Sequence, residues 1–412
     1  MKHSLRLNKY VALLGAAALV APAGLNAQND NVPEGLQPVL SSVSDLTIKG
    51  SFGAEFGASG VNRNRGNAPA DSFSTFNVSH LRLGVEATVY DDFHFDTVLS
   101  MLPSGPSIAH DLGERQFFVN PGVNLYRATL TYGAFEPFDV TLGYDRPRFG
   151  IEASRADEDL NTITRSVLST GIGPRQHTGV SIHGEWDILD YHAGIYNADA
   201  GSSSNAPGVY PVSYMFTLGG GVDIDEWAQI IHPDLAADVR VDYIHVDETG
   251  GFGPPAGIPA IPAFPGSAWY KQAVAIGADV DFAGLNVTYE YMWARANDQL
   301  GFAARPRVRG FVITPSYFLT DDFEIVGRYE RIRNTEVNTI GGLLPHNAYA
   351  NSINGLQPPF GGSKYQAVYL GGNYYLHEEY VKLMGGLELA ELRGPGMQSR
   401  THTAMTALRM QF

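Results

Sequence analysis

Residues 285–294 read LNVTYEYMWA, and apolar and polar side chains alternate along this stretch. Leu285, Val287 and Tyr289 fall on one side of an extended chain, whereas Thr288 and Glu290 fall on the other. Successive side chains of a β-strand point to opposite faces. The stretch therefore predicts a strand with one apolar face and one polar face.

The same pattern recurs from Leu46 to the end of the chain, with a turn after each alternating segment. The predicted strands cover residues 46–56, 73–90, 93–102, 124–134, 138–145, 177–186, 188–197, 212–223, 235–247, 268–281, 285–297, 308–319, 322–334, 364–376, 380–391 and 401–412. Sixteen is an even number within the size range of bacterial outer-membrane barrels. Pro315 lies inside one predicted strand, where it must remove a ladder hydrogen bond or occupy a bulge.

The connections between these strands are alternately short and long. Short ones fall at 91–92, 136–137, 283–284, 320–322 and 377–379, and long ones at 57–72, 103–122, 146–176, 199–211, 248–266, 298–308, 335–363 and 393–400. Short periplasmic turns and long extracellular loops are typical of outer-membrane barrels. The connection at 225–233 is the exception, because it occupies the place of a short turn and has room for a short helix.

These observations predict an all-β protein, an antiparallel transmembrane β-barrel of about sixteen strands. In such a barrel the apolar faces contact lipid and the polar faces line the lumen. A soluble β-sandwich with alternating core and solvent faces is the alternative. It accounts neither for the unequal connections nor for the end of the chain.

The composition agrees with a membrane barrel. Charged residues make up 17% of the chain, below the ~25% of ordinary soluble proteins. The mean hydropathy is −0.11, and no stretch after residue 27 has 18 consecutive apolar residues, so membrane helices are not predicted. The chain has no cysteine, which excludes disulfides, thiolate metal sites and cysteine nucleophiles.

Residues 1–27 have the pattern of a secretory signal peptide. Three basic residues precede an apolar run at 11–21, and the small residue Ala27 suits cleavage. The run is shorter than the ~20 residues of a spanning helix, which argues against the alternative of an N-terminal anchor. Removal of the peptide takes away three positive charges and moves the formal net charge from −15 to −18, which argues against a nucleic-acid partner. Residues 28–45 follow as a polar periplasmic lead-in, and the barrel covers 46–412.

The last residues carry a third signal. Leu408, Met410 and Phe412 share one face of the final predicted strand, and Phe412 ends the chain. This arrangement resembles the C-terminal signal that the barrel assembly machinery of the outer membrane reads. We therefore expect that machinery as a partner, with outer-membrane lipid and lipopolysaccharide around the finished barrel.

Two stretches resemble a known family. The first is LGYDRPRFGIE at 142–152, followed by ITRSVL at 163–168 and GVSIHG at 179–184, and the second is SYFLTDDF at 316–323. Both resemble segments of the phosphate-selective porin O/P family, and the predicted layout is similar along nearly the whole mature chain. The resemblance implies a sixteen-stranded barrel, usually a trimer, whose third loop folds inward and narrows the pore. In this chain that loop is 146–176.

Strand parity predicts which charged residues face the lumen. The basic residues predicted to line the pore are Lys49, Arg82, Arg127, Arg240, Lys271, Arg328, Lys382 and Arg409. The acidic residues of the same parity are Glu55, Glu86, Asp96, Asp145, Glu185, Asp190, Asp238, Asp242, Asp279, Asp281, Glu290, Glu324, Glu330 and Glu388. Because opposite charges on neighbouring strands pair, no uniformly basic wall is predicted.

The third loop is also mixed in charge. Its arginines, at the predicted pore constriction, are Arg146, Arg148, Arg155, Arg165 and Arg175, and its acidic residues include Glu152, Asp157, Glu158 and Asp159. Two interpretations stay open. The arginines bind anions at the constriction, or they brace the loop against the acidic wall.

These patterns predict a porin for passive diffusion of small hydrophilic solutes or ions. The family resemblance adds anions such as phosphate as candidates and implies a homotrimer. No cofactor and no metal site is expected, and neither a Gly-x-Ser-x-Gly motif nor a zinc-protease helix motif occurs. The chain is therefore not predicted to be an enzyme. The alternatives are a non-conducting barrel that serves as an adhesin or structural anchor, and a barrel enzyme.

Overall fold

The computed structural model describes residues 43–63, 71–101, 123–198, 214–247, 270–296, 307–335, 363–377, 380–394 and 397–412. The predicted signal peptide, residues 28–42 of the predicted lead-in and most of the predicted long connections lie outside the described residues.

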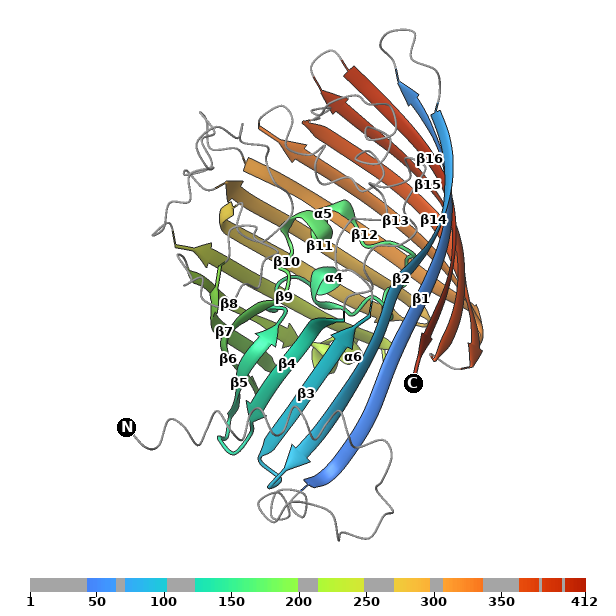
Figure 1. Ribbon diagram of the computed structural model, residues 1–412. Coiled ribbons are helices and arrows are strands. Elements are labelled where there is room, and N and C mark those ends of the chain that lie inside the picture. The colour runs from blue at the N-terminus through green and yellow to red at the C-terminus, as the bar shows by residue number, and fades with distance from the viewer. Residues whose placement is uncertain are drawn as a thin grey trace.

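The described residues form sixteen antiparallel strands in one closed sheet (Figure 1). Each strand pairs with the next along the chain, and β1 pairs with β16 to close the ring. The strands are β1 Val43–Arg63, β2 Asp71–Val89, β3 Phe93–Ser100, β4 Asn124–Tyr132, β5 Phe138–Asp145, β6 His177–Trp186, β7 Leu189–Asn197, β8 Tyr214–Asp223, β9 Leu235–Val246, β10 Tyr270–Phe282, β11 Leu285–Ala296, β12 Arg307–Thr320, β13 Phe323–Asn334, β14 Lys364–His377, β15 Val381–Gly394 and β16 Met397–Gln411. The predicted sixteen-stranded antiparallel barrel is confirmed. A soluble sandwich is excluded, because a closed ring has no second sheet.

The two faces of the barrel have an inverted distribution of side chains. Large apolar residues on the outer face are exposed, such as Leu218, Leu370 and Leu387 at 61–62%. Charged residues on the inner face, such as Arg328 and Glu330, are buried. A water-soluble protein buries its apolar residues and exposes its charges. The inversion is that of a barrel whose outer face contacts lipid.

Local chemistry explains the turns and the irregular strand. Ala283 and Gly284 have φ of 49° and 82°, and two successive left-handed residues form the tight turn that suits a hairpin. Within β12, the pairing with β13 lapses between Ile313 and Ser316 and resumes in the same register. Pro315 lies in this gap and has no N–H to donate. Pro315 therefore removes a hydrogen bond of the ladder and does not produce a bulge.

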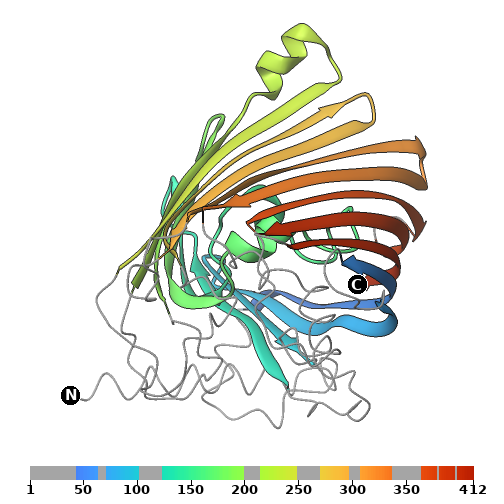
Figure 2. The same cartoon turned by 90° about the horizontal axis from the view of Figure 1, so that it is seen from above.

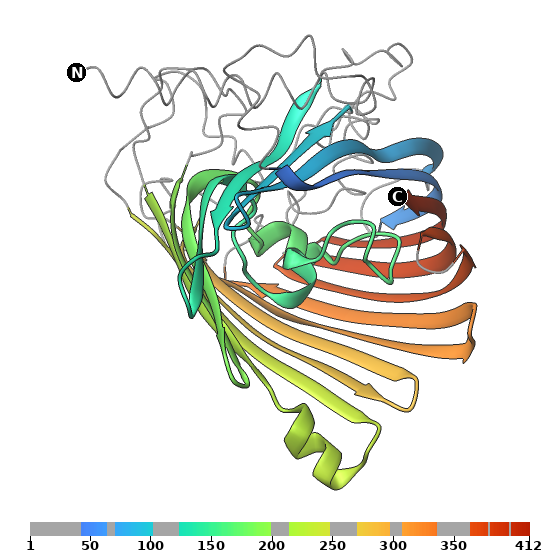
Figure 3. The same cartoon turned by 90° about the horizontal axis from the view of Figure 1, so that it is seen from below.

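One helix lies in the connection between β8 and β9. This is α6 (Asp225–Ile231), in the connection that had room for a short helix, and Figure 3 shows it projecting from the end of the barrel. No helix among the described residues is long and apolar enough to cross a membrane.

Candidate functional site

The segment 146–176 between β5 and β6, called the third loop here, lies inside the ring of strands. It contains two short helices, α4 (Ile151–Ser154) and α5 (Val167–Ile172). Figures 2 and 3 show both helices within the barrel, seen from its two ends. The loop therefore divides the lumen, and its contacts with the wall decide which space remains open.

An apolar core holds the loop against one side of the lumen. Phe149 and Leu168 of the loop are almost fully buried and belong to one cluster with Ile244, Met292 and Ile332 of the barrel wall. These three wall residues have the same strand parity as the lumen-facing charges. The expectation that lumen-facing positions are polar is therefore wrong for this part of the wall, because the loop shields it from water.

Carboxylates of the wall satisfy the N-termini of both loop helices. The Gly150 N–H donates to Asp242 Oδ2 at 2.6 Å, and the Ile151 N–H donates to Glu290. The Val167 N–H donates to Glu330 Oε2 at 3.0 Å. The first N–H groups of a helix have no partner within the helix, and their positive dipole end favours an anion. The acidic wall thus anchors the loop.

Cations of the wall hold the loop between its helices. Lys382 and Arg409 both donate to the Leu160 carbonyl, at 3.0 and 3.2 Å, and Arg409 also donates to the Ile163 carbonyl at 2.6 Å. Arg328 donates to the Thr164 carbonyl and to Glu388 at 2.8 Å. All three cations are buried. These predicted pore-lining residues therefore lie between the barrel wall and the loop, where they bind main-chain carbonyls of the loop.

Arg82 and Arg165 hold the acidic part of the loop from two sides. Asp157 accepts hydrogen bonds from Arg82 and from Arg165, the latter at 2.9 Å. Loss of water contact would raise the pKa of Asp157, but the two guanidinium groups outweigh it and hold that pKa well below the usual range. Arg165 also donates to the Glu152 and Arg155 carbonyls. It ties the loop to itself and is not a free cation of the constriction.

The remaining predicted lining residues form pairs with the acidic wall. Lys49 lies 3.1 Å from Asp96, and Arg127 lies 2.9 Å from Asp145. Arg148 and Arg240 both approach Asp190, with Arg148 at 3.2 Å. Arg155 pairs with Asp279. Lys271 lies apart from these residues, at a register shift of β10.

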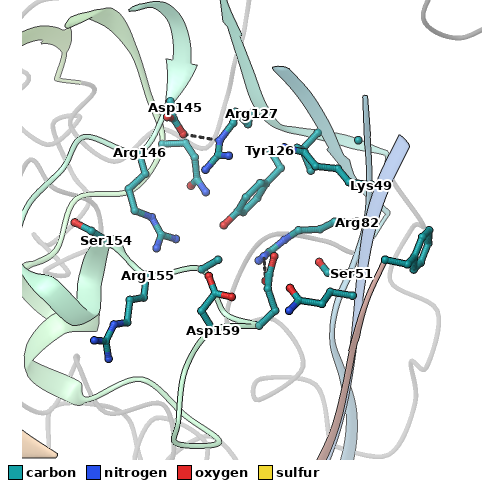
Figure 4. Close-up of a pocket in the computed structure, with 18 of the residues that line it drawn as sticks. Lys49, Ser51, Arg82, Tyr126, Arg127, Asp145, Arg146, Ser154, Arg155 and Asp159 are labelled. Carbon is teal, nitrogen blue, oxygen red and sulfur yellow. Dashed lines mark hydrogen bonds and ion pairs between the residues drawn. The ribbon is translucent and has the colours of Figure 1, made fainter. Parts of the chain in front are cut away.

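A cavity of about 650 Å³ remains open between the loop and the strands β1 to β5. Figure 4 shows its labelled side chains converging on this space from the wall and from the loop. Its basic lining residues are Lys49, Arg82, Arg127, Arg146, Arg148 and Arg155, and its acidic ones are Asp145, Glu158 and Asp159. Five of these six cations pair with carboxylates of the wall or the loop, so the positive charge that no described carboxylate pairs with here is that of Arg146.

Arg146 is the lining cation that acidic residues neutralise least. Its Nη1 donates to the Ala153 carbonyl at 3.0 Å, and among the described residues no carboxylate forms an ion pair with it. Its Nε is buried and has no hydrogen-bond partner in the described part of the chain. Burial lowers the pKa of Arg146, and nearby Arg165 lowers it further. Burial also lowers the pKa of Arg175, and the charge of Arg146 adds to that. An anion between these two cations would relieve their repulsion.

Phe412, directly after β16, lines the same cavity and continues the pairing between β16 and β1. Its N–H donates to the Gly50 carbonyl at 3.0 Å, and the Gly50 N–H donates back at 2.8 Å. A Cβ atom on Gly50 would lie 2.5 Å from Phe412 Cζ, so the ring needs a glycine beneath it. Met410 and Phe412 are exposed, at 39% and 66%.

The sequence predicted that the loop folds inward, but it did not predict the apolar contact between the loop and the wall. Val167–Ile172 is a short apolar helix, and the segment YMWA at 291–294 is apolar on both strand faces. A strand that is apolar on both faces is typical of a sheet covered on both sides. This stretch is the signal in the sequence that indicates a covered wall. The described residues contain no group of side chains that could hold a metal ion.

Comparison with known proteins identifies the fold. No known family profile matches the chain, and no curated sequence is similar to it. Solved structures are similar over 89% of the chain. They include a loop-deletion variant of OmpT from Vibrio cholerae (TM-score 0.56, 12% identity, 99% of that chain), the outer-membrane channel DcaP of Acinetobacter baumannii (0.55, 11%, 97%) and an anion-selective porin from Comamonas acidovorans (0.54, 13%, 99%). At such low identity the likeness shows a shared fold. The chain therefore has the sixteen-stranded barrel architecture of outer-membrane porins.

Proposed function

We propose that this chain is an outer-membrane porin, a passive channel for small hydrophilic solutes that favours anions. The barrel surrounds a lumen that the third loop narrows on one side and leaves open beside β1 to β5. No step of chemical catalysis is needed for this role. The structural neighbours are porins, and one of them is described as anion-selective.

The cation that carries the preference for anions is Arg146. The other five cations that line the cavity pair with carboxylates of the wall or the loop. Asp145 and Glu158 are already paired with Arg127 and Arg82. Arg146 has only a main-chain acceptor among the described residues. A cation without a paired carboxylate in a channel raises the local concentration of anions and lowers that of cations.

A planar bilayer recording under a KCl gradient tests both parts of the proposal. A channel is expected to give discrete conductance steps, and a reversal potential of the sign set by chloride. The absence of steps from correctly folded protein would instead support a barrel that acts as an adhesin or structural anchor. A reversal potential set by potassium would contradict the preference for anions.

The third loop is proposed as the constriction. Deleting residues 155–170 removes the acidic stretch and most of α5 while leaving α4 and its anchors at Asp242 and Glu290. We expect a larger single-channel conductance, because the open space would then extend across the lumen. An unchanged conductance in a folded barrel would show that this segment does not limit ion flow.

We further propose that the channel selects phosphate and that three copies of the chain form a trimer. The segments 142–152 and 163–168 resemble the phosphate-selective porin O/P family, and both contribute to the third loop and its anchors. A porin of that type is expected to show chloride conductance that millimolar phosphate blocks, and to sediment as three copies. Phosphate that fails to block, with chloride still conducted, would indicate a general anion porin.

A further inference from the structure

The outer face of the barrel carries a dense group of cations at one end of β11 to β16. Its members, named the basic arc here, are Arg295, Arg307, Arg309, Arg331, Arg333, Lys364, Arg393 and Arg400. They alternate with buried residues that face the lumen, such as Val308, Ile332 and Tyr365. All lie at the strand ends that adjoin the connections 297–306, 335–362 and 395–396, away from the short turns.

Like charges stand directly opposite each other in this arc. Arg309 is the register partner of Arg333, which pairs on its other side with Lys364, and Lys364 pairs in turn with Arg393. Arg295 likewise stands opposite Arg307. Directly opposed like charges destabilise a sheet. Four cations in one row across four strands therefore call for an external counter-charge.

The chain itself supplies little negative charge here. Among the described residues, the acidic side chain within the arc is Glu391. It forms ion pairs with Arg393 at 2.7 Å and with Arg400 at 3.1 Å. The other six cations form no ion pair with a described carboxylate. The three adjoining connections contain two acidic residues, Asp298 and Glu336, and one further Arg305. Positive charge thus remains in large excess.

The arc marks the upper edge of the lipid-facing surface. Toward the middle of the same strands the outer face becomes aromatic and apolar. Phe311 and Tyr329 contact edge to face at 5.8 Å, and Val368 and Leu370 are 50% and 62% exposed. A cation at that edge lies at the level of lipid headgroups, and apolar side chains below it contact acyl chains.

Among the described residues, these outward cations lie on one arc of the rim. On β2, β6 and β8, at the strand ends that adjoin long connections, exposed residues include Ser74, Thr178, Tyr214 and Phe216, which carry no charge. Eight of the 28 lysines and arginines of an acidic chain are gathered on six neighbouring strands. A general attraction to an anionic surface would not require this concentration.

From this geometry we propose that the basic arc binds the phosphorylated headgroup of lipopolysaccharide, an anionic glycolipid, with its acyl chains against the apolar band below. Guanidinium groups bind phosphate through paired, charge-assisted hydrogen bonds. Several cations in a row suit a headgroup that bears more than one phosphate. The proposal rests on the outer-membrane location in the proposed function, but it does not require an open channel.

The test uses purified full-length barrel in detergent and measures binding of bisphosphorylated lipid A by native mass spectrometry. Arg333→Gln/Lys364→Gln removes two opposed cations and is expected to weaken binding by about thirtyfold, since each basic residue near an anionic lipid surface contributes a roughly fivefold factor. The matched control is Ser74→Glu/Thr178→Glu, which changes the net charge by the same two units at exposed strand ends outside the arc. The control is expected to bind as the unchanged protein does.

Three results would overturn the proposal. Dephosphorylated lipid A that binds equally well would show that acyl chains alone are recognised. Equal loss in the control would show a general charge effect. A change of oligomer mass in the arc variant, without loss of lipid, would assign the arc to contact between copies.

Heat-modifiable migration on a gel verifies that each variant folds. If the first variant does not fold, Arg307→Gln/Arg331→Gln takes its place. Single-channel conductance unaffected by the arc variants would separate this proposal from the channel function.

Discussion

Arg146 offers the sharpest test of how the lumen chooses between anions and cations. Its side chain points into the cavity beside the third loop (Figure 4), and its charge has no described carboxylate partner. Arg146→Gln removes that charge and leaves a shorter, neutral polar side chain. The variant should shift ion selectivity toward cations without changing the barrel.

The size of the shift follows from Coulomb's law. An ion passing ~5 Å from a unit charge in water interacts with it by about 0.8 kcal/mol. Screening over ~8 Å at physiological ionic strength reduces this to roughly 0.4 kcal/mol. Anions lose and cations gain that amount when the charge is removed. The ratio of anion to cation permeability is therefore expected to fall about fourfold.

The assay is the reversal potential of single channels in a planar bilayer under a KCl gradient, at low ionic strength on both sides. Arg146→Lys is the control, because it keeps the charge and should keep the selectivity. The shift should shrink as salt is raised, since screening grows. The reasoning would be refuted if the glutamine variant had the same permeability ratio as the unchanged protein. A shift that persists at ~1 M salt would refute it as well.

Three further perturbations probe the loop, the closure of the barrel and the response to acid. Arg328→Met leaves the Glu388 carboxylate buried without its partner at 2.8 Å, which should lower the free energy of unfolding by about 3–5 kcal/mol. The melting temperature should fall and the conductance should fluctuate. A steady channel of normal stability would contradict the bracing role. Gly50→Val places an atom 2.5 Å from the Phe412 ring, so the yield of heat-modifiable barrel should drop, and deletion of Phe412 should lower it as well. Normal yields from both variants would contradict the closing role. The depressed pKa of Asp157 means that its stabilising contribution is present above the ordinary carboxyl pKa of ~3.9 and is lost only when pH falls below that. Conductance should stay constant from neutral pH to about pH 4.5, whereas a change near pH 6 would contradict the assignment.

The strands of this barrel could be read from residue order because their periodicity is local. In β11, side chains at 285, 287 and 289 face lipid, and those at 288 and 290 face the lumen. Lipid selects apolar residues on the outer face along the part of each strand that contacts acyl chains. A period of two therefore appears in the sequence without any knowledge of neighbours.

The third loop could be predicted only in part. Its length and its place after β5 marked it as unusual, and its mixed charges left two interpretations open. The structure divides its arginines between them: Arg165 braces the loop, Arg155 pairs with Asp279, and Arg146 faces the open cavity. The position of Arg155 depends on Asp279 of the distant strand β10, and that of Arg165 on partners which the folded loop brings together. Distances of that kind are not contained in the order of the residues.

The sequence by itself determined the closed barrel, its sixteen strands and the lipid-facing surface, because alternation and turn residues act within each hairpin. Only the tertiary structure decided what fills the lumen. Parity assigned Arg328 and Arg409 to the pore wall, and the fold then placed the loop in front of them, where they hold main-chain carbonyls. Parity also predicted polar lumen positions throughout, whereas Ile244 and Met292 lie beneath the docked loop. A strand pattern states which face a side chain occupies, but what lies opposite that face is set by contacts between segments more than 90 residues apart in the chain.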